Sequence, residues 1–486
     1  MIFGLLFTVL LSETHFLDFD KCLDIAMEQS YAMKRLKEDM LQAELGLKAT
    51  TRSRWTNIHL GMTAPEYKET MQKFEDSLGV YYTPIKQSIY SSNLIISQPL
   101  PSDGEIYFRS GYYSTSDFFR DKNTVQLNTQ IGFVQPLEAL YSYNKQQSSL
   151  KQAQLNYEKS QKRMKREKLN LKYEVSSFFY NLVSSQEQEK IASQTLEYQR
   201  EANNLAQNKY KAGVIAEVDA LQMEIDLAEA KNSYSMAVDD VQAQEDLLKK
   251  LLQIDLDDKL KLNYDMTYNK VFIDVTDAIE RGLKNRLEIK ESEISREIAE
   301  INLKKTKVNS HITGDIHGYY DLIGVNQDDI DHNYLKTVEG AFDNMNDKKG
   351  NRGISLNISI PVWDWGVNKA RINAAKADIR KAEYAIKNEK FNVKLDIRKT
   401  VADLQSALRR LELLERNVTV AEKSFEISRK RFANGDIKSQ DLAVNRNRLN
   451  VAYTNRLNAF ITYKLKLADL TRKTFYDYEL QQEVVD

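Results

Sequence analysis

Alternating apolar and polar residues predict several long strands. In the segment 125–133, Val125, Leu127, Ile131 and Phe133 are apolar, and the residues between them are polar or glycine. This period of two is typical of a strand with one apolar and one polar face. The same pattern recurs elsewhere, so we expect strands at 53–62, 124–136, 311–322 and 352–361. Strands of about 8 to 12 residues can cross a bilayer when tilted, although a strand of a soluble β-sandwich has the same period.

Long helices are expected in most of the remaining sequence. Glycine and proline are absent from about 141 to 211 and from about 367 to 434, so each run is a helix of about 70 residues, or about 105 Å. Apolar residues at three-and-four spacing, among them Leu404, Leu408 and Leu411, indicate coiled-coil seams. The predicted helices are 141–211 and 365–434, each followed by a shorter one at 215–254 or 437–473 and preceded by another at about 19–50 or 274–307.

One short motif occurs twice, after each of the two longest helices. An aromatic residue is followed three positions later by glycine and six positions after that by aspartate. The copies are Tyr210, Gly213 and Asp219 in the first half, and Phe432, Gly435 and Asp441 in the second. Each glycine is expected to adopt the left-handed conformation that ends a helix, with the aromatic residue covering the turn.

The repeated motif is part of a duplication of nearly the whole chain. The number of positions between Pro136 and its counterpart Pro361 is almost the same as the number between Gly213 and Gly435. The matching strands that precede these two prolines are farther apart along the chain. The unmatched residues of the first half, 63–124, are therefore expected to form an outside loop, with a further hairpin turning at 102–104. The predicted organisation is a signal segment, 1–15, a first repeat, 16–264, a second repeat, 265–475, and a C-terminal tail, 476–486.

Composition excludes several classes of partner and anchor. Charged residues make up 29% of the chain and the net charge is −1, which gives no general attraction to nucleic acid. The single cysteine, Cys22, excludes an internal disulfide, and the preceding residues FDK disfavour a lipid anchor on it.

The first eleven residues resemble the apolar core of a secretory signal, without the usual basic residue before it. No stretch is apolar enough for a transmembrane helix.

No catalytic, cofactor or metal site is expected, so the chain is not expected to be an enzyme. The five histidines show no spacing typical of metal ligands. An acidic segment at 343–350 resembles a calcium loop, but Met345 occupies a position that requires an oxygen ligand. The sequence contains neither a phosphate-binding glycine loop nor a nucleophile elbow.

The order of elements resembles the TolC family of outer-membrane efflux and secretion channels. The resemblance depends on the segment IPVWDWGVNKAR, in which Pro361 ends a strand and Gly366 precedes a long helix, on its counterpart VQPL around Pro136, and on the two repeated turns. It implies a mainly α fold with β structure: a coiled-coil α-helical barrel and a transmembrane β-barrel. Both barrels would be built by a homotrimer, with about four strands per protomer and twelve in all.

The resemblance also implies a function, a location and partners. The chain would be the passive exit duct of a tripartite efflux or type I secretion system, in the outer membrane of a diderm bacterium with a large periplasmic portion. Its partners would be outer-membrane lipid, a periplasmic adaptor (membrane fusion) protein and an inner-membrane pump of RND, ABC or MFS type. The alternative is a periplasmic coiled-coil adaptor or structural protein that bridges transport complexes without forming a pore.

The resemblance places the two turns at the periplasmic entrance, where Asp441 and Asp219 would form a gate and selectivity ring. The alternative is that each carboxylate only complements the positive end of a helix. Some relatives carry a further aspartate and an arginine where this chain has Val444 and Ile437. This difference, and phenylalanine in place of a frequent tyrosine at position 432, favours a closed state held by packing. The nearby cations are Arg431, Lys438 and Arg446.

Overall fold

The computed structural model describes residues 14–484, except 77–78 and 142. The chain divides into two compact units: unit 1 contains 1–40, 159–292 and 385–486, and unit 2 contains 41–158 and 293–384. Of the signal segment predicted at 1–15, residues 1–13 lie outside the described residues, and Thr14 and His15 begin strand β1. In the described part of the chain, no helix has both the length and the apolar character needed to span a membrane.

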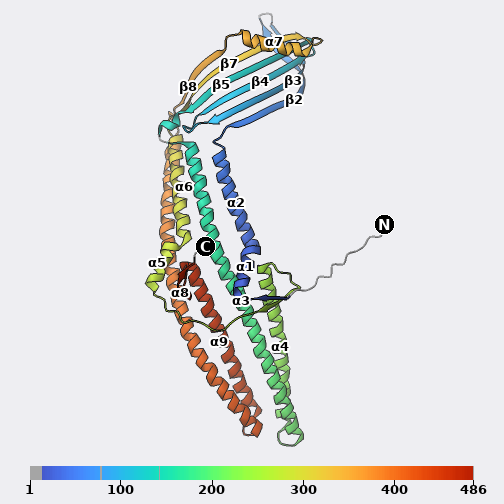
Figure 1. Ribbon diagram of the computed structural model, residues 1–486, viewed down its shortest axis with the longest axis vertical. Coiled ribbons are helices and arrows are strands. Elements are labelled where there is room, and N and C mark those ends of the chain that lie inside the picture. The colour runs from blue at the N-terminus through green and yellow to red at the C-terminus, as the bar shows by residue number, and fades with distance from the viewer. Residues whose placement is uncertain (1–13, 77–78, 142, 485–486) are drawn as a thin grey trace, which may run out of the picture. The chain divides into compact units, whose positions relative to one another are not determined.

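Unit 2 contains an antiparallel sheet of six strands in the order β2-β3-β4-β5-β7-β8 (Figure 1). The resemblance implied about four strands, and the two additional ones, β3 and β4, come from the segment 63–124. The hairpin predicted at 102–104 is confirmed as the turn between them, where Leu100 N–H donates to Gly104 O (2.7 Å). The strands are β2 (Asn57–Asp76), β3 (Gly79–Pro99), β4 (Glu105–Asp117), β5 (Lys122–Pro136), β7 (Thr313–Asp329) and β8 (Asn351–Ser359).

The sheet has one apolar and one polar face along the half of the strands nearest the helices. Residues that lie opposite each other in neighbouring strands share a face. The strand register aligns Ile58, Ile96, Phe108, Ile131 and Tyr320 in one row, which ends at Arg352 in β8. The rows beside it on the same face contain Leu60, Leu94, Ile106, Phe133, Ile316, Ile354, Leu356 and Ile358. The opposite face carries Asn57, His59, Asn93, Arg109, Gln130, Asp315, Asp321, Ser355 and Asn357.

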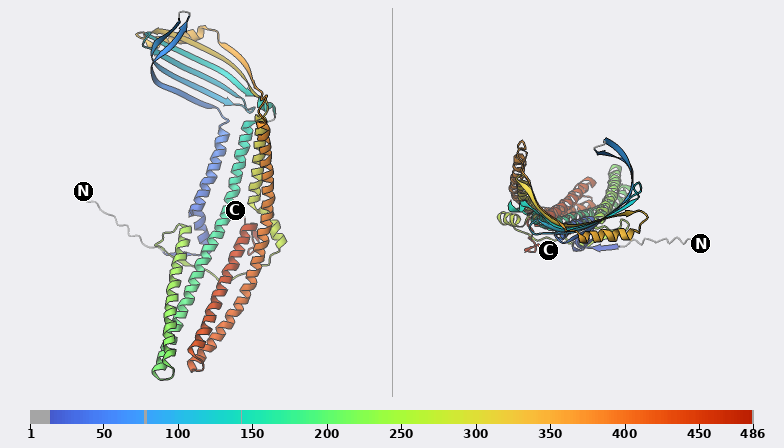
Figure 2. Two further views of the ribbon diagram at one scale, coloured as in Figure 1. Left: turned by 180° about the vertical axis from the view of Figure 1, so that it is seen from behind. Right: turned by 90° about the horizontal axis from the view of Figure 1, so that it is seen from above.

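Helix α7 (Tyr334–Asp347) packs on the same face as the apolar rows, over the far ends of β5 and β7. The sheet is curved, and α7 lies on its convex side (Figure 2). Gly324 permits this close approach, because a Cβ there would lie 2.0 Å from Ala341 O. Asn326 Nδ2 donates to Thr337 O (3.3 Å), and Val325 N–H donates to Asn344 Oδ1 (3.1 Å). The segment 323–352, between the two strands predicted in the second repeat, therefore contains the end of β7, the helix α7 and the first residues of β8.

The described residues form eight further α-helices in the two repeats. The two regions predicted as single helices at 19–50 and 274–307 are each broken in two, at Ser30 and Arg286. Neither break is marked by glycine or proline in the sequence. The helices are α1 (Phe19–Gln29), α2 (Tyr31–Arg52), α3 (Lys145–Lys211), α4 (Glu217–Leu252), α5 (Val275–Asn285), α6 (Leu287–Asn309), α8 (Val367–Asn434) and α9 (Ser439–Thr474).

The core of unit 1 lies along the predicted seams of the long helices. Leu404, Leu408 and Leu411 of α8 are buried in a cluster with residues of α5 and α9. A second cluster joins α3 to α1 and α4 around Val175 and Leu182. The coiled-coil seams predicted from the three-and-four spacing are therefore confirmed at these positions.

Short strands tie the ends of the chain to unit 1. Strand β1 (Thr14–Leu17) pairs in parallel with β6 (Lys259–Leu262). Strands β9 (Tyr476–Asp477) and β10 (Gln482–Glu483) pair in the segment predicted as the C-terminal tail. Cys22 in α1 is fully buried, and burial raises the pKa of its thiol to about 12. A thiol in this environment acts as a small apolar side chain.

Candidate functional site at the helix turns

The first helix turn is fixed by backbone hydrogen bonds around Gly213. Gly213 N–H donates to Tyr210 O (2.8 Å), and Val214 N–H donates to Lys209 O (2.8 Å). This pair of bonds is the Schellman motif, which requires a left-handed residue at the glycine position. Gly213 has a φ of +72°, so the predicted role of this glycine as a helix cap agrees with the backbone geometry.

The second turn has the same backbone arrangement around Gly435. Gly435 N–H donates to Phe432 O (3.1 Å), Asp436 N–H donates to Arg431 O (2.9 Å), and Gly435 has a φ of +86°. The repeated sequence motif therefore corresponds to a repeated turn. Both turns lie at the same end of unit 1 (Figure 1).

The aromatic side chains of the two turns have different environments. Phe432 is 8% exposed and belongs to a small core with Phe425, Leu442 and Leu449. Tyr210 is 39% exposed. An aromatic residue was expected to cover each turn, but in this chain only the Phe432 ring is buried, while Tyr210 contributes its carbonyl oxygen.

A lysine that the sequence did not single out connects the two turns. Lys209 in the last turn of α3 donates through Nζ to Phe432 O (3.1 Å) and Ala433 O (3.5 Å) of α8. Its ammonium also lies 5.1 Å from the centroid of the Phe432 ring. A cation at the last carbonyls of a helix is stabilised by the negative end of the helix dipole. The sequence marks Lys209 only as a basic residue near a helix end, because its partner is 223 positions away.

The two aspartates of the repeated motif line one cavity. The cavity has a volume of about 440 Å³, and Asp219, Asp441, Lys209, Phe432 and Gly435 are among its lining residues. Asp219 lies in the first turn of α4 and is half-buried, and Asp441 lies in the first turn of α9 and is exposed. The structure thus brings both aspartates of the predicted ring together within one chain. Complementation of the helix dipoles fits the same positions.

The three cations near the turn have different surroundings. Lys438 lines the 440 Å³ cavity and is the N-cap residue of α9. Arg446 lines a separate cavity of about 610 Å³ together with Asp226 and Glu229. Burial lowers the pKa of Arg446, against the opposing effect of those two carboxylates. The side chain of Arg431 is exposed, and its carbonyl oxygen belongs to the second turn.

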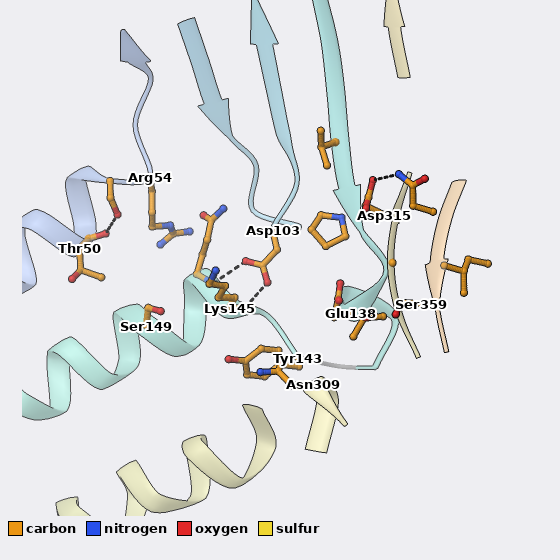
Figure 3. A pocket seen from close by; sticks show the side chains of 18 residues that line it. Thr50, Arg54, Asp103, Glu138, Tyr143, Lys145, Ser149, Asn309, Asp315 and Ser359 are labelled. Carbon is orange, nitrogen blue, oxygen red and sulfur yellow. Dashed lines mark hydrogen bonds between the residues drawn. The ribbon is translucent and has the colours of Figure 1, made fainter. Parts of the chain in front are cut away.

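The first strand-to-helix junction is held by the turn between β3 and β4 (Figure 3). The Asp103 carboxylate accepts hydrogen bonds from Lys145 N–H and from Gln146 N–H (2.8 Å), the first two residues of α3. Asn144 Nδ2 donates to Pro101 O (2.6 Å). Asp103 therefore satisfies helix donors that have no partner within the helix. The sequence placed Asp103 only in the hairpin turn and did not predict this role.

The second junction is capped locally. Asp364 accepts hydrogen bonds from Asn368 N–H (2.8 Å) and Gly366 N–H (2.9 Å), and these bonds lower the pKa of its carboxyl group. Gly366 has a φ of +85°. Pro136 ends β5, whereas Pro361 follows the end of β8 by two residues. The first junction and the end of β8 line a cavity of about 880 Å³, and Asp103, Glu138, Tyr143, Asp315 and Ser359 are among its lining residues (Figure 3).

The described residues contain no group of three or more histidine, cysteine, aspartate or glutamate side chains that could hold a metal ion. Two of the histidines have a polar partner of another kind. His317 Nε2 lies 2.7 Å from the Tyr107 hydroxyl, and His15 Nε2 lies 3.0 Å from Asp258 Oδ2.

The structure thus combines a sheet that has one mainly apolar face with two long helical hairpins that have matching turns. The family described as "Outer membrane efflux protein" matches residues 108–252 and 329–472. The two matched segments together make up more than half of the chain, which therefore belongs to this family. Its relatives are channels rather than known enzymes.

Solved structures support the same fold. The Campylobacter jejuni CmeC outer membrane channel is similar over 96% of this chain and 87% of its own, with 15% identity and a TM-score of 0.66. The outer membrane protein VceC of Vibrio cholerae covers 94% of this chain and 95% of its own, at 12% identity and a TM-score of 0.66. The Neisseria gonorrhoeae MtrE outer membrane channel, described in its open state, is similar over 94% of this chain and 88% of its own, with 15% identity and a TM-score of 0.65. A search of curated protein sequences finds no match.

Proposed function

We propose that this chain is the outer-membrane exit duct of a tripartite efflux or type I secretion system. The observation that carries the proposal is the sheet of six antiparallel strands. Along the half of the strands nearest the helices, one face of this sheet is mainly apolar and the other is mainly polar. A sheet with these two faces fits a wall between lipid and a water-filled lumen. The location would be the outer membrane, with the helical hairpins in the periplasm.

Aromatic residues near the ends of the strands fit this location. Trp363 and Trp365 follow β8, and their side chains are 74% and 88% exposed. Tryptophan side chains favour the boundary between lipid and water, because the ring is apolar and its N–H is polar. The strand ends next to the junctions would then lie at the periplasmic surface of the membrane.

The duct would be a homotrimer gated at the helix turns. In a trimer, Asp441 and Asp219 would each occur three times around the axis, and a ring of carboxylates attracts cations and repels anions. Opening would move the turns apart, exchanging contacts such as that between Lys209 Nζ and Phe432 O for contacts with a partner. The closed state would depend on the packing of Phe432 as well as on charge.

The partners would supply both energy and cargo. An inner-membrane pump of RND, ABC or MFS type would drive export, and a periplasmic adaptor protein would dock on the helical hairpins. The duct itself would then be passive. Its contribution to selectivity would come from the ring of aspartates and from the width of the lumen.

Ion selectivity in planar bilayers tests the gate. Replacing Asp441 with asparagine removes the charge and nearly preserves the shape, so cation selectivity should fall and block by divalent ions should weaken. The matched control is Asp239→Asn, an exposed carboxylate in the middle of α4, which should change neither quantity. Equal selectivity in the wild type and in Asp441→Asn would remove Asp441 from the ring.

Membrane extraction tests the location independently of the gate. A barrel protein should remain with the outer membrane after washing with salt or carbonate and should dissolve only in detergent. Release without detergent would favour the periplasmic adaptor alternative and contradict the proposed duct.

A further inference from the structure

We propose that neighbouring copies of this chain join through β2 and β8, so that three copies close a barrel of eighteen strands rather than twelve. The inference rests on the proposed trimeric duct and concerns how its wall is built. Each copy supplies the six strands of one sheet. The partner is therefore a second copy of the same chain at each edge.

Both outer edges of the sheet are available for pairing. Within the described residues, β2 pairs only with β3 and β8 pairs only with β7. All residues of β8 except Gly353 are exposed. An unpaired strand edge presents a row of backbone donors and acceptors, and a membrane offers no water to satisfy them.

The directions of the edge strands match. Every neighbouring pair in the sheet is antiparallel, and the number of strands is even, so β2 and β8 run in opposite directions. Joining β2 of one copy to β8 of the next therefore continues the antiparallel order around the whole barrel. An odd number of strands per copy would have placed two parallel strands at each junction.

The two edges overlap over the length of β8. Strand β2 has twenty residues and pairs with β3 from Asn57 to Thr63 and again, after a shift of register, from Glu66 to Asp76. Strand β8 has nine residues. Beyond β8, helix α7 covers the free edge of β7, where Val325 N–H donates to Asn344 Oδ1. The join is thus limited by the nine residues of β8, beyond which α7 lies beside β7.

The faces of the two edges are compatible. On β2, Ile58 and Leu60 lie on the apolar face and His59 on the polar face. On β8, the apolar face carries Leu356 and Ile358, and Asn357 lies on the polar face opposite Asp315. Pairing of β2 with β8 so that their apolar residues share one face keeps both faces of the sheet continuous. A shift of one residue would turn the apolar side chains of one strand to the polar face.

The two additional strands are integral to the sheet. The turn between β3 and β4 caps α3 through Asp103. Ser102 Oγ donates to Gln135 Oε1 (2.6 Å), and Gln135 Nε2 donates to Ser102 O (2.8 Å). A twelve-stranded barrel would require β3 and β4 to leave the wall, which would break the pairing of β3 with β2 and of β4 with β5.

An eighteen-stranded wall has consequences for the cargo. Barrel diameter grows roughly in proportion to the number of strands, so the lumen would be about one and a half times as wide as that of a twelve-stranded barrel. Barrels of 16 to 18 strands hold an open aqueous channel. The membrane part would therefore admit larger solutes, and the helix turns would be the narrowest passage.

Electron cryomicroscopy of the purified wild-type protein tests the strand count directly. We expect a trimer with eighteen strands and α7 on the outside of the wall. A trimer with twelve strands would overturn the inference and leave the proposed duct intact. A protein that forms neither a trimer nor a lumen would contradict the proposed duct itself.

Cysteine cross-linking tests the same join in the membrane. In a Cys22→Ala background, His59→Cys combined with Ser355→Cys or Asn357→Cys places thiols on the polar face of the two edges. Oxidation should produce bands at two and three times the protomer mass of 56.3 kDa. The control pair, His59→Cys with Asn128→Cys in the interior strand β5, should remain monomeric in the gel. Cross-links from Arg109→Cys in β4 to Ser355→Cys between copies, without the β2 to β8 product, would overturn the join.

Discussion

The two helix turns share one backbone and differ in their side chains. Both have the Schellman hydrogen bonds and a glycine with positive φ. The Phe432 ring is buried in a small core and the Phe432 carbonyl accepts from Lys209, whereas the side chain of Tyr210 is 39% exposed. Duplication has thus preserved the geometry of the turn, while the second turn has become the anchored one. We expect the closed state of the gate to depend on the second turn more than on the first.

The largest expected difference between the turns comes from their aromatic residues. Phe432→Ala should lower the free energy of local opening at the second turn by about 2 to 4 kcal/mol, because a buried ring is lost and a cavity remains. Tyr210→Ala should lower it at the first turn by less than about 1 kcal/mol, since its side chain is largely solvated. Hydrogen exchange of the amides around each turn measures both values. Equal effects at the two turns would contradict the asymmetry.

The glycines should behave alike at the two turns. Gly213→Ala and Gly435→Ala should each lower the free energy of unfolding by about 1 to 2 kcal/mol, because a Cβ is unfavourable in the left-handed region. Gly→Asn should cost less, since asparagine tolerates this conformation. Gly46→Ala within α2 is the matched control: nothing lies within 4 Å of a Cβ there, so alanine should stabilise by about 0.5 to 1 kcal/mol. Thermal unfolding and hydrogen exchange would report these changes.

Loss of the bond between the turns should have a smaller effect. Lys209→Met preserves most of the aliphatic stem but removes the donor to Phe432 O, so protection of the second turn should fall by about 1 kcal/mol. The corresponding residue of the other turn, Arg431, has an exposed side chain, and Arg431→Met should have almost no effect. In bilayers, channels of the Lys209→Met variant should be open more often than channels of the Arg431→Met variant. The reverse order would remove Lys209 from the gate.

The smallest effects on stability are expected for the aspartates. Asp219→Asn and Asp441→Asn should each change helix stability by about 0.3 to 1 kcal/mol, the range for a charge near a helix terminus. This change should diminish in high salt, because both sites are at least partly exposed. Thermal unfolding at low and high ionic strength checks the prediction. A loss of several kcal/mol in either variant would mean a structural role that dipole complementation does not explain.

The local parts of the fold could be predicted from the sequence. Helix length followed from the absence of glycine and proline, and the two turns followed from Gly213 and Gly435, because a left-handed cap is a local property. The seam through Leu404 and Leu411 followed from spacing alone. These features depend on residues that are close together along the chain.

The remaining features depend on contacts between distant residues. Lys209 reaches a carbonyl 223 positions away, and Asp103 caps a helix 42 positions later. The segment 63–124 was predicted to form an outer loop with a hairpin, because the second repeat has no counterpart to it, but its strands β3 and β4 pair within the main sheet. The helix breaks at Ser30 and Arg286 have no glycine or proline to mark them.

Conductance of the purified wild-type protein in planar bilayers tests the central claim most directly. If three copies form a duct closed at aspartate-lined turns, addition of the protein should produce uniform, cation-selective current steps, and the active species should be a detergent-soluble trimer. A monomer that dissolves without detergent and produces no current steps would contradict the account.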